Sequence, residues 1–104
     1  PRESFCAFFL NSQNGVIAFE ELFQGTINSV TVHPRIVLQR ALHHNAAAVV
    51  LAHNHPSAFT EPSQADKLIT ERLAQVLGMV DVKVLDHLIV GGCDIFSFAE
   101  HGLI

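Results

Sequence analysis

The sequence predicts a single mixed α/β domain, with one sheet packed against helices. Its 104 residues suffice for one domain with a modest core and leave no room for a second, so we assign residues 1–104 to one unit. Hydrophobic residues make up 49% and charged residues 15%, which is typical of a globular chain rather than a disordered one. Strand-like and helix-like segments alternate in the order β-β-(β)-α-β-α-β-β, and this order predicts the layered class.

The first elements form a predicted hairpin. Residues 5–10 are rich in β-formers, and residues 16–23 are expected to form the returning strand. The Asn14-Gly15 dipeptide between them is a strong signal for a tight hairpin turn. A further short run at 29–32 is expected to extend the sheet.

A helix is predicted over residues 34–44. Pro34 suits a first helical position, and Asn45 suits the end of the helix. The apolar residues recur at helical spacing: Val37, Leu38, Ala41 and Leu42. The following run, 46–52, is apolar without alternation, which predicts a central strand buried on both faces.

The second half begins with a loop at 53–62 that is rich in Pro, Ser and Thr. A second helix is expected to open at Ser63, run to Leu77 and stop at Gly78. Its predicted buried stripe consists of Ala65, Leu68, Ile69, Leu73, Val76 and Leu77. A strand at 82–90, a tight turn at 91–94 and a short strand at 95–98 complete the domain.

Charge and cysteine content exclude some classes of protein. The net charge of −4 and the scattered basic residues argue against direct binding of nucleic acid. Cys6 and Cys93 belong to no Cys-x-x-Cys pair, so a cysteine zinc site is excluded. They either form one disulfide or remain two buried free thiols in a reducing compartment, and we favour the free thiols.

No targeting or membrane segment is apparent. The longest apolar run, 46–52, is too short to cross a bilayer, and the first residues lack the basic start of a signal peptide. We therefore expect a cytoplasmic protein without membrane contact. A chain that begins on Pro1 without Met is expected to be part of a longer protein. The sequence does not indicate the oligomeric state.

The candidate chemistry lies after the central strand. His53 and His55 flank one residue, so in extended backbone their imidazoles point the same way. Asp66 falls in the first turn of the second helix, on the shoulder of its buried stripe. Two imidazoles, one carboxylate and a water make a catalytic zinc site. The plainer alternative is that Ser63-x-x-Asp66 is only a helix-capping box, and both interpretations are compatible.

Two other metal-site classes fit poorly. The letters His-Asn-His suggest an HNH nuclease, but that class spreads its three residues over a ββα motif and needs a basic surface for phosphate. A zinc deaminase requires His-x-Glu followed by Pro-Cys-x-x-Cys, and neither is present.

The spacing His53-x-His55-x7-Ser63-x2-Asp66 matches the JAMM (MPN+) metalloprotease motif at every fixed position. Its neighbouring sequence resembles the RadC branch of that superfamily along essentially the whole chain, in the segments 21–29, 32–35, 53–57, 62–66 and 85–91. The resemblance implies a JAMM/MPN-like, cytidine-deaminase-like layered domain. One departure is Ala58, where RadC loops usually carry a Gly that takes positive φ at little cost.

The resemblance also implies a zinc metalloprotease that cleaves a peptide or isopeptide with Zn²⁺ held by His53, His55 and Asp66. The family adds a Glu from an early strand as the base, and here Glu20 and Glu21 are the candidates. Alternation places them on opposite faces, and the spacing usual in RadC sequences selects Glu20. Ser63 is expected to donate to the developing oxyanion.

The sequence allows two interpretations of the Asp86-His87 pair and two of the function. Asp86-His87 is either a pair that orients a ligand imidazole or a structural pair within its strand. The alternative function is a non-catalytic zinc-binding interaction module, linked to DNA repair only by the family label.

Overall fold

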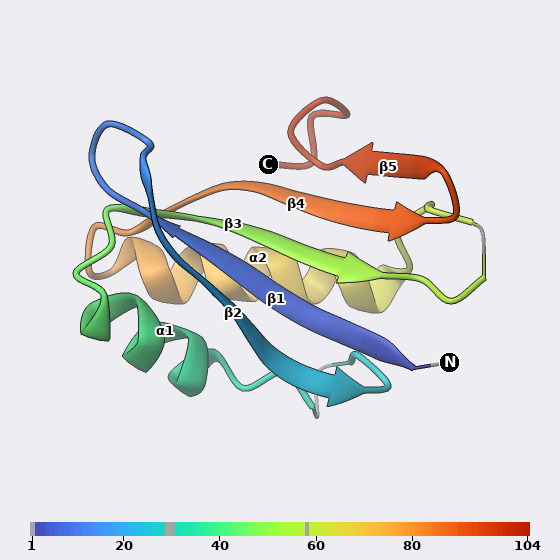
Figure 1. The fold of residues 1–104 in the computed structure, drawn as a ribbon, viewed down its shortest axis with the longest axis horizontal. Coiled ribbons are helices and arrows are strands. Elements are labelled where there is room, and N and C mark those ends of the chain that lie inside the picture. The colour runs from blue at the N-terminus through green and yellow to red at the C-terminus, as the bar shows by residue number, and fades with distance from the viewer. Residues whose placement is uncertain (1, 29–30, 58) are drawn as a thin grey trace.

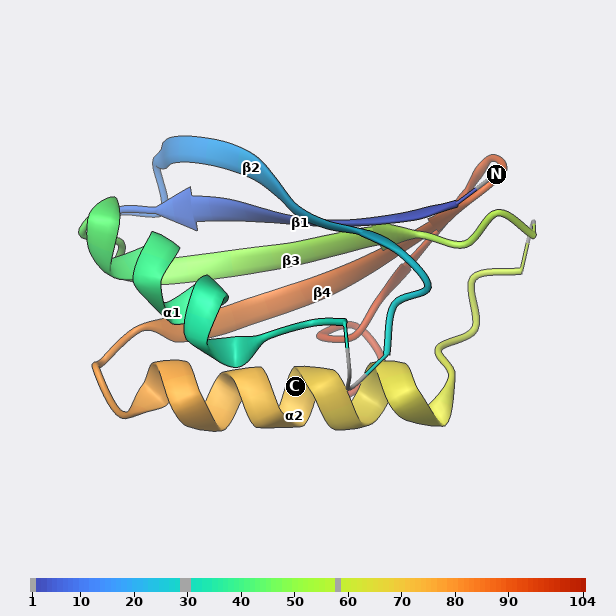
Figure 2. The same cartoon turned by 90° about the horizontal axis from the view of Figure 1, so that it is seen from below.

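The computed structural model describes residues 2–28, 31–57 and 59–104. Its five strands form one sheet in the order β2-β1-β3-β4-β5 (Figure 1). Both helices lie on the same face of this sheet (Figure 2). The fold is therefore the predicted mixed sheet layered against helices. The elements are β1 (Glu3–Leu10), β2 (Val16–Gly25), α1 (Pro34–His43), β3 (Ala48–Asn54), α2 (Gln64–Gly78), β4 (Lys83–Gly91) and β5 (Asp94–Ser97).

The hairpin between β1 and β2 forms where the sequence predicts it. Asn14 takes a left-handed backbone conformation with φ of 62°. The Asn11 side chain accepts the backbone N–H of Gln13 at 2.9 Å and that of Gly15 at 2.8 Å. These bonds satisfy the turn's own donors, as Asn commonly does in tight turns.

The strand β3 occupies the centre of the sheet. It pairs antiparallel with β1 and parallel with β4, and α2 supplies the crossover between β3 and β4. The prediction that it is buried on both faces is wrong for one face: Val50 and Ala52 are only partly buried. An apolar run indicates the average burial of a strand but not which elements cover each of its faces. In this fold both helices cover the same face of the sheet.

Helix α1 ends one residue before the predicted boundary. Asn45 follows it with φ of 51°, the left-handed conformation that terminates many helices. The predicted strand at 29–32 does not join the sheet in its described part, because Thr31 lies in a turn and Val32 in irregular structure. Residues 29 and 30 of that run, and Ala58, lie outside the described residues.

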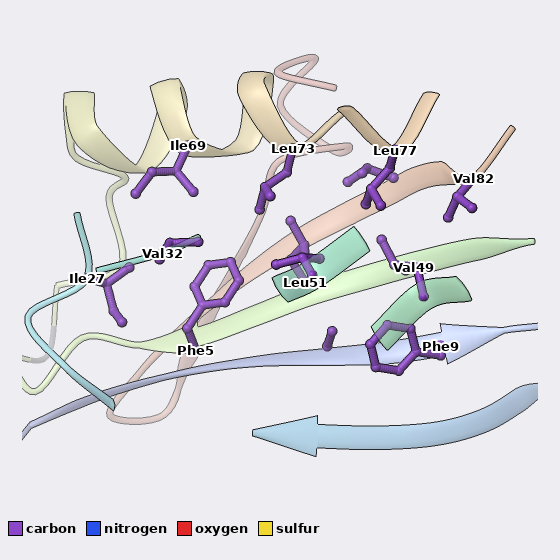
Figure 3. Close-up of a cluster of buried hydrophobic side chains, with 14 residues drawn as sticks. Phe5, Phe9, Ile27, Val32, Val49, Leu51, Ile69, Leu73, Leu77 and Val82 are labelled. Carbon is purple, nitrogen blue, oxygen red and sulfur yellow. The ribbon is translucent and has the colours of Figure 1, made fainter. Parts of the chain in front are cut away.

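The core fills the space between the sheet and the two helices (Figure 3). Alternate residues of β1 point into it, which brings Phe5 and Phe9 against the helices. Helix α2 contributes Ile69, Leu73 and Leu77, whereas the predicted core residue Leu68 is 55% exposed. The buried side chains of this core are Phe5, Ala7, Phe9, Ile27, Val32, Val37, Ala41, Val49, Leu51, Ile69, Leu73, Leu77, Val82 and Val84.

The two cysteines are free thiols, as favoured from the sequence, but Cys6 is only partly buried and Cys93 is exposed. In the described part of the chain, no helix combines the length and apolarity needed to cross a bilayer.

Candidate metal centre

The two predicted histidine ligands lie at the end of β3. His53 is the last but one residue of the strand, and His55 continues its backbone path by donating its N–H to the Val90 carbonyl at 2.8 Å. This extended backbone turns both imidazoles to one side, with ring centroids 4.9 Å apart. The loop predicted to begin at His53 therefore begins two residues later, and the expected orientation of the pair is present.

Asp66 faces this histidine pair from the first turn of α2. Its side chain is 3% exposed, with Oδ1 3.4 Å from His53 Nε2 and Oδ2 3.2 Å from His55 Nε2. Burial alone would raise the pKa of Asp66, but the adjacent His53 imidazole and the Ser63 backbone N–H outweigh it and hold this pKa well below its usual range. The structure thus brings together His53, His55 and Asp66 with the carboxylate ionised.

Ser63 and Asp66 also form the capping box that the sequence suggested. Ser63 Oγ accepts the Asp66 N–H at 3.0 Å, and the Ser63 N–H donates to Asp66 Oδ2 at 2.8 Å. The same carboxylate therefore closes the helix N-terminus and meets both imidazoles. An accepting hydroxyl retains its own proton for donation, and Ser63 as a whole residue is exposed.

A second carboxylate approaches the pair from the first strand. Glu3, His53 and His55 each offer a ligand atom, and the three atoms lie within 4.8 Å of one another. Phe5 pairs with His53 across β1 and β3, so Glu3, two residues earlier, lies level with His55 and on the same face as Phe5. Glu3 was not among the predicted site residues, because the predicted strand began at Phe5. A signal was available in the sequence: Glu3, Phe5 and Ala7 occupy every second position, which places Glu3 on the same face of the strand as these two apolar residues.

Asn54, between the two histidines, fixes the backbone on either side of Glu3. Its Oδ1 accepts the Ser4 N–H at 2.7 Å, and its Nδ2 donates to the Arg2 carbonyl at 3.2 Å. Because Asn54 points to the opposite face of β3 from His53, it holds the start of β1 without entering the metal site.

Glu20, the predicted base, does not join this group. It pairs with Ala7 in the β1–β2 register. Glu20 therefore lies on β2, the strand on the far side of β1 from β3. Ala7 is two residues along β1 from Phe5, the residue that pairs with His53. Its carboxylate accepts Arg40 Nε at 2.8 Å and Arg40 Nη2 at 2.7 Å, and it also contacts His44. The hydrogen bonds from Arg40, together with His44, lower its pKa to about 2. Alternation correctly placed Glu20 and Glu21 on opposite faces of β2, and the RadC spacing selected Glu20, which the structure places at the level of Ala7 rather than of Phe5.

The other early acid, Glu21, lies on the opposite face from Glu20. It pairs with Cys6 in the register, is exposed, and contacts the Gln24 side chain. Neither acid of β2 therefore reaches the two histidines.

His87 of β4 lies directly behind His53. His87 is fully buried, and its Nε2 is 2.7 Å from His53 Nδ1. Burial, and then the neighbouring His53, lower the pKa of His87 to about 3, which keeps it neutral. Asp86 does not pair with its ring: it accepts the Ser97 hydroxyl at 2.6 Å and the Ala99 N–H at 2.9 Å, and so holds the turn after β5.

The donor atoms of this group fit a cation. Within the described residues, His53 Nε2 is buried and has no hydrogen-bond partner. His55 Nδ1 is 2.9 Å from the Phe59 carbonyl and Nε2 is 3.2 Å from Asp66 Oδ2, and both of these oxygens only accept. A cation bound at Nε2 would leave the Nδ1 proton for the Phe59 carbonyl. Two imidazole nitrogens and a carboxylate are the ligand types of catalytic zinc sites.

The site is open to solvent on one side. A hollow of about 180 Å³ lies beside Glu3. It is lined by Arg2, Glu3, Gly25, Thr26 and Pro56. His55 and Glu3 each keep part of their side chain exposed, at 16% and 22%, whereas His53 and Asp66 are closed off. Of these four side chains, Glu3 and His55 are therefore the ones accessible from solution.

Comparison with known proteins shows the family of the chain. Residues 1–103 match the family described as the RadC-like JAB domain. The chain is 67% identical to the UPF0758 protein YeeS of Escherichia coli K12 over 103 residues, which are 99% of this chain and 70% of that protein. It is 65% identical to the UPF0758 protein YkfG of the same strain, covering 65% of it. A UPF0758 protein of Nitrosococcus oceani is 60% identical, and the chain spans 46% of its length.

Proposed function

Because this chain belongs to the RadC-like JAB domain family, we propose that it is a zinc-dependent metallohydrolase that cleaves amide bonds in peptides or isopeptides. The JAB family includes metalloproteases, and the ligand types of the site are those of catalytic zinc. In this proposal, His53, His55 and Asp66 would hold the zinc ion, which would activate a water.

One observation carries the proposal. The buried Nε2 of His53 has no hydrogen-bond partner in the described part of the chain, although it lies 3.4 Å from one carboxylate and 4.0 Å from another. A buried polar atom without a partner is costly, and native proteins rarely keep one without a use for it. A cation between Asp66 and the two imidazoles removes that cost.

Glu3 replaces Glu20 as the proposed base. When bound at such a site, zinc polarises a carbonyl and lowers the pKa of a water to about 7. The Glu3 carboxylate takes a proton from the attacking water as its oxygen bonds to the amide carbon. The C–N bond then breaks, and Glu3 returns that proton to the leaving nitrogen. The Ser63 hydroxyl donates to the oxygen that gains charge during the attack.

The substrate is proposed to enter beside Glu3. The hollow there is small and open, which suits an extended chain rather than an enclosed small molecule. Phe59, 80% exposed on the loop after His55, offers an apolar contact to a neighbouring substrate side chain.

The proposal is tested by incubating zinc-loaded protein with a mixed library of peptides and isopeptides and analysing the products by mass spectrometry. Glu3→Gln and Glu20→Gln form a matched pair, since each removes one carboxylate charge from an early strand. We expect cleavage by the wild type and by Glu20→Gln, and its loss in Glu3→Gln. Cleavage that persists in Glu3→Gln refutes the assignment of the base. Zinc binding without any cleavage favours the non-catalytic interaction module instead.

A further inference from the structure

Three short contacts run in series behind the site. His53 Nδ1 is 2.7 Å from His87 Nε2, and His87 Nδ1 is 2.6 Å from Thr70 Oγ1. Thr70 Oγ1 is in turn 2.7 Å from the backbone carbonyl oxygen of Asp66. The series therefore starts at the imidazole of one proposed zinc ligand and ends at the backbone of another.

The carbonyl at the end of the series sets the direction of every bond. A carbonyl oxygen only accepts, and 2.7 Å is the usual distance of an O–H···O bond, so the single Thr70 hydroxyl proton lies between these oxygens. Thr70 Oγ1 must then accept from His87 Nδ1–H. A neutral imidazole with its proton on Nδ1 has a lone pair on Nε2, so His87 accepts at Nε2 from His53 Nδ1–H.

We propose that Thr70 and His87 are positioning residues that fix His53 in the tautomer with its proton on Nδ1. The lone pair of His53 then lies on Nε2, the atom that faces Asp66 and Glu3. In this form the imidazole is ready to bind a cation, because neither proton transfer nor ring rotation is needed first.

Packing against neighbouring side chains prevents the His87 ring from rotating. Its ring stacks on Phe98 with centroids 4.7 Å apart and meets the edge of Phe5 at 5.6 Å. Thr70 is also buried, at 2% exposure, on the inner face of α2. These contacts leave His87 facing His53 with one nitrogen and Thr70 with the other.

If the hydrogen bonds between Thr70, His87 and His53 ran in the opposite direction, His53 would carry its proton on the other ring nitrogen. If Thr70 donated to His87 Nδ1, His87 would donate from Nε2 to His53 Nδ1, and the His53 proton would lie on Nε2. That proton would occupy the position where the zinc ion is proposed to bind. The two directions therefore differ in the protonated nitrogen of His53, which can be measured without metal.

The inference rests on the proposed function only in naming zinc as the cation, since the tautomer belongs to the metal-free protein. The experiment is to record imidazole ¹⁵N chemical shifts of the chelator-treated protein at alkaline pH, where histidines are neutral. We expect the shifts of His53 to report a protonated Nδ1 and an unprotonated Nε2. A protonated Nε2 in the wild type overturns the proposal without any variant.

Two substitutions of Thr70 make the test specific to the hydroxyl. Thr70→Ser keeps the hydroxyl and loses a methyl group, whereas Thr70→Val keeps the shape and loses the hydroxyl. We expect Thr70→Ser to retain the wild-type tautomer. In Thr70→Val, His87 Nδ1–H loses its acceptor, so the proton of His87 moves to Nε2 and that of His53 moves to Nε2 as well. An unchanged His53 tautomer in folded Thr70→Val contradicts the series.

Zinc affinity, measured by competition with a chelator, is the second readout. We expect Thr70→Val to bind zinc about 10–100-fold more weakly than Thr70→Ser, the usual effect of removing a group that orients a metal ligand. Equal affinities overturn the positioning role. If the wild type shows the expected tautomer but binds no zinc, the proposed function fails and the tautomer assignment stands. If the wild type binds zinc but carries a protonated Nε2 when metal-free, the tautomer assignment fails and the zinc site stands.

Discussion

The Glu3 carboxylate lies 4.0 Å from Nε2 of His53, although the two residues are far apart in the sequence. The antiparallel pairing of Phe5 with His53 brings them together, because it sets the end of β3 beside the start of β1. The Asn54 amide then clamps the backbone on both sides of Glu3. The position of the proposed base therefore depends on strand register and on this one amide.

The clamp predicts that Asn54→Ala weakens catalysis without removing the metal. Without the amide, the start of β1 is free to move, and misplacing a catalytic group by about 1 Å costs up to about 100-fold in rate. Zinc content should stay at the wild-type level, because Asn54 points away from the ligands. Parallel measurement of zinc content and of kcat for a cleaved peptide checks this. Loss of zinc together with activity would show that Asn54 supports the whole site rather than Glu3.

The ion pair of Glu20 predicts a structural effect of its loss. Glu20 joins β2 to α1 through Arg40 and His44. We expect Glu20→Gln to lower the free energy of unfolding by at most about 1 kcal/mol, as for other solvent-accessible ion pairs. Urea denaturation measures this change. Glu21→Gln, on the opposite face of the same strand, is the control and should have the smaller effect; the reverse order would contradict the structure.

The same ion pair predicts a dependence of stability on pH. The Glu20 pKa is lowered from 4.5 to about 2 in the folded protein, so the folded state favours the ionised form. This stabilisation is complete above the unfolded pKa and disappears as the pH falls through 4.5 towards 2. The difference in unfolding free energy between wild type and Glu20→Gln should therefore shrink over this range. Urea titrations at a series of pH values test it, and a difference that grows on acidification would be incompatible with the ion pair.

Ser63 has a structural and a proposed catalytic role, and substitutions separate them. Ser63→Ala removes the helix cap and should lower stability by about 1 kcal/mol. Ser63→Thr keeps the capping oxygen and serves as the control. If Ser63 also donates to the oxyanion, Ser63→Ala lowers kcat by about 100-fold or more, far beyond what lost stability alone produces in a folded enzyme. A normal kcat in Ser63→Ala leaves the residue with the capping role only.

Features that depend on near neighbours in the sequence were predictable. The common orientation of His53 and His55 follows from extended backbone, and the inward position of Asp66 follows from helical spacing. The capping box, too, lies within four residues, since Ser63 and Asp66 meet in one helical turn. For these residues the local geometry alone fixed the direction of the side chain.

Features that depend on strand pairing were not predictable in the same way. Glu3 and Glu20 both lie in early strands and both face the helices, so alternation cannot choose between them. The choice is made by the register of β1 against β3, which arises from packing of the whole sheet. The face of β3 that carries Val50 was misjudged for a related reason, because the placement of both helices on one side is a property of the complete fold.

The central claim is that His53, His55 and Asp66 form a zinc site, and metal content tests it most directly. The protein is purified without chelators, supplied with zinc, dialysed and analysed by inductively coupled plasma mass spectrometry. We expect about one zinc ion per chain in the wild type and in Glu3→Gln, and its loss in His53→Ala and Asp66→Asn. A wild type that retains no zinc, or a folded His53→Ala that retains as much as the wild type, would contradict the proposed site.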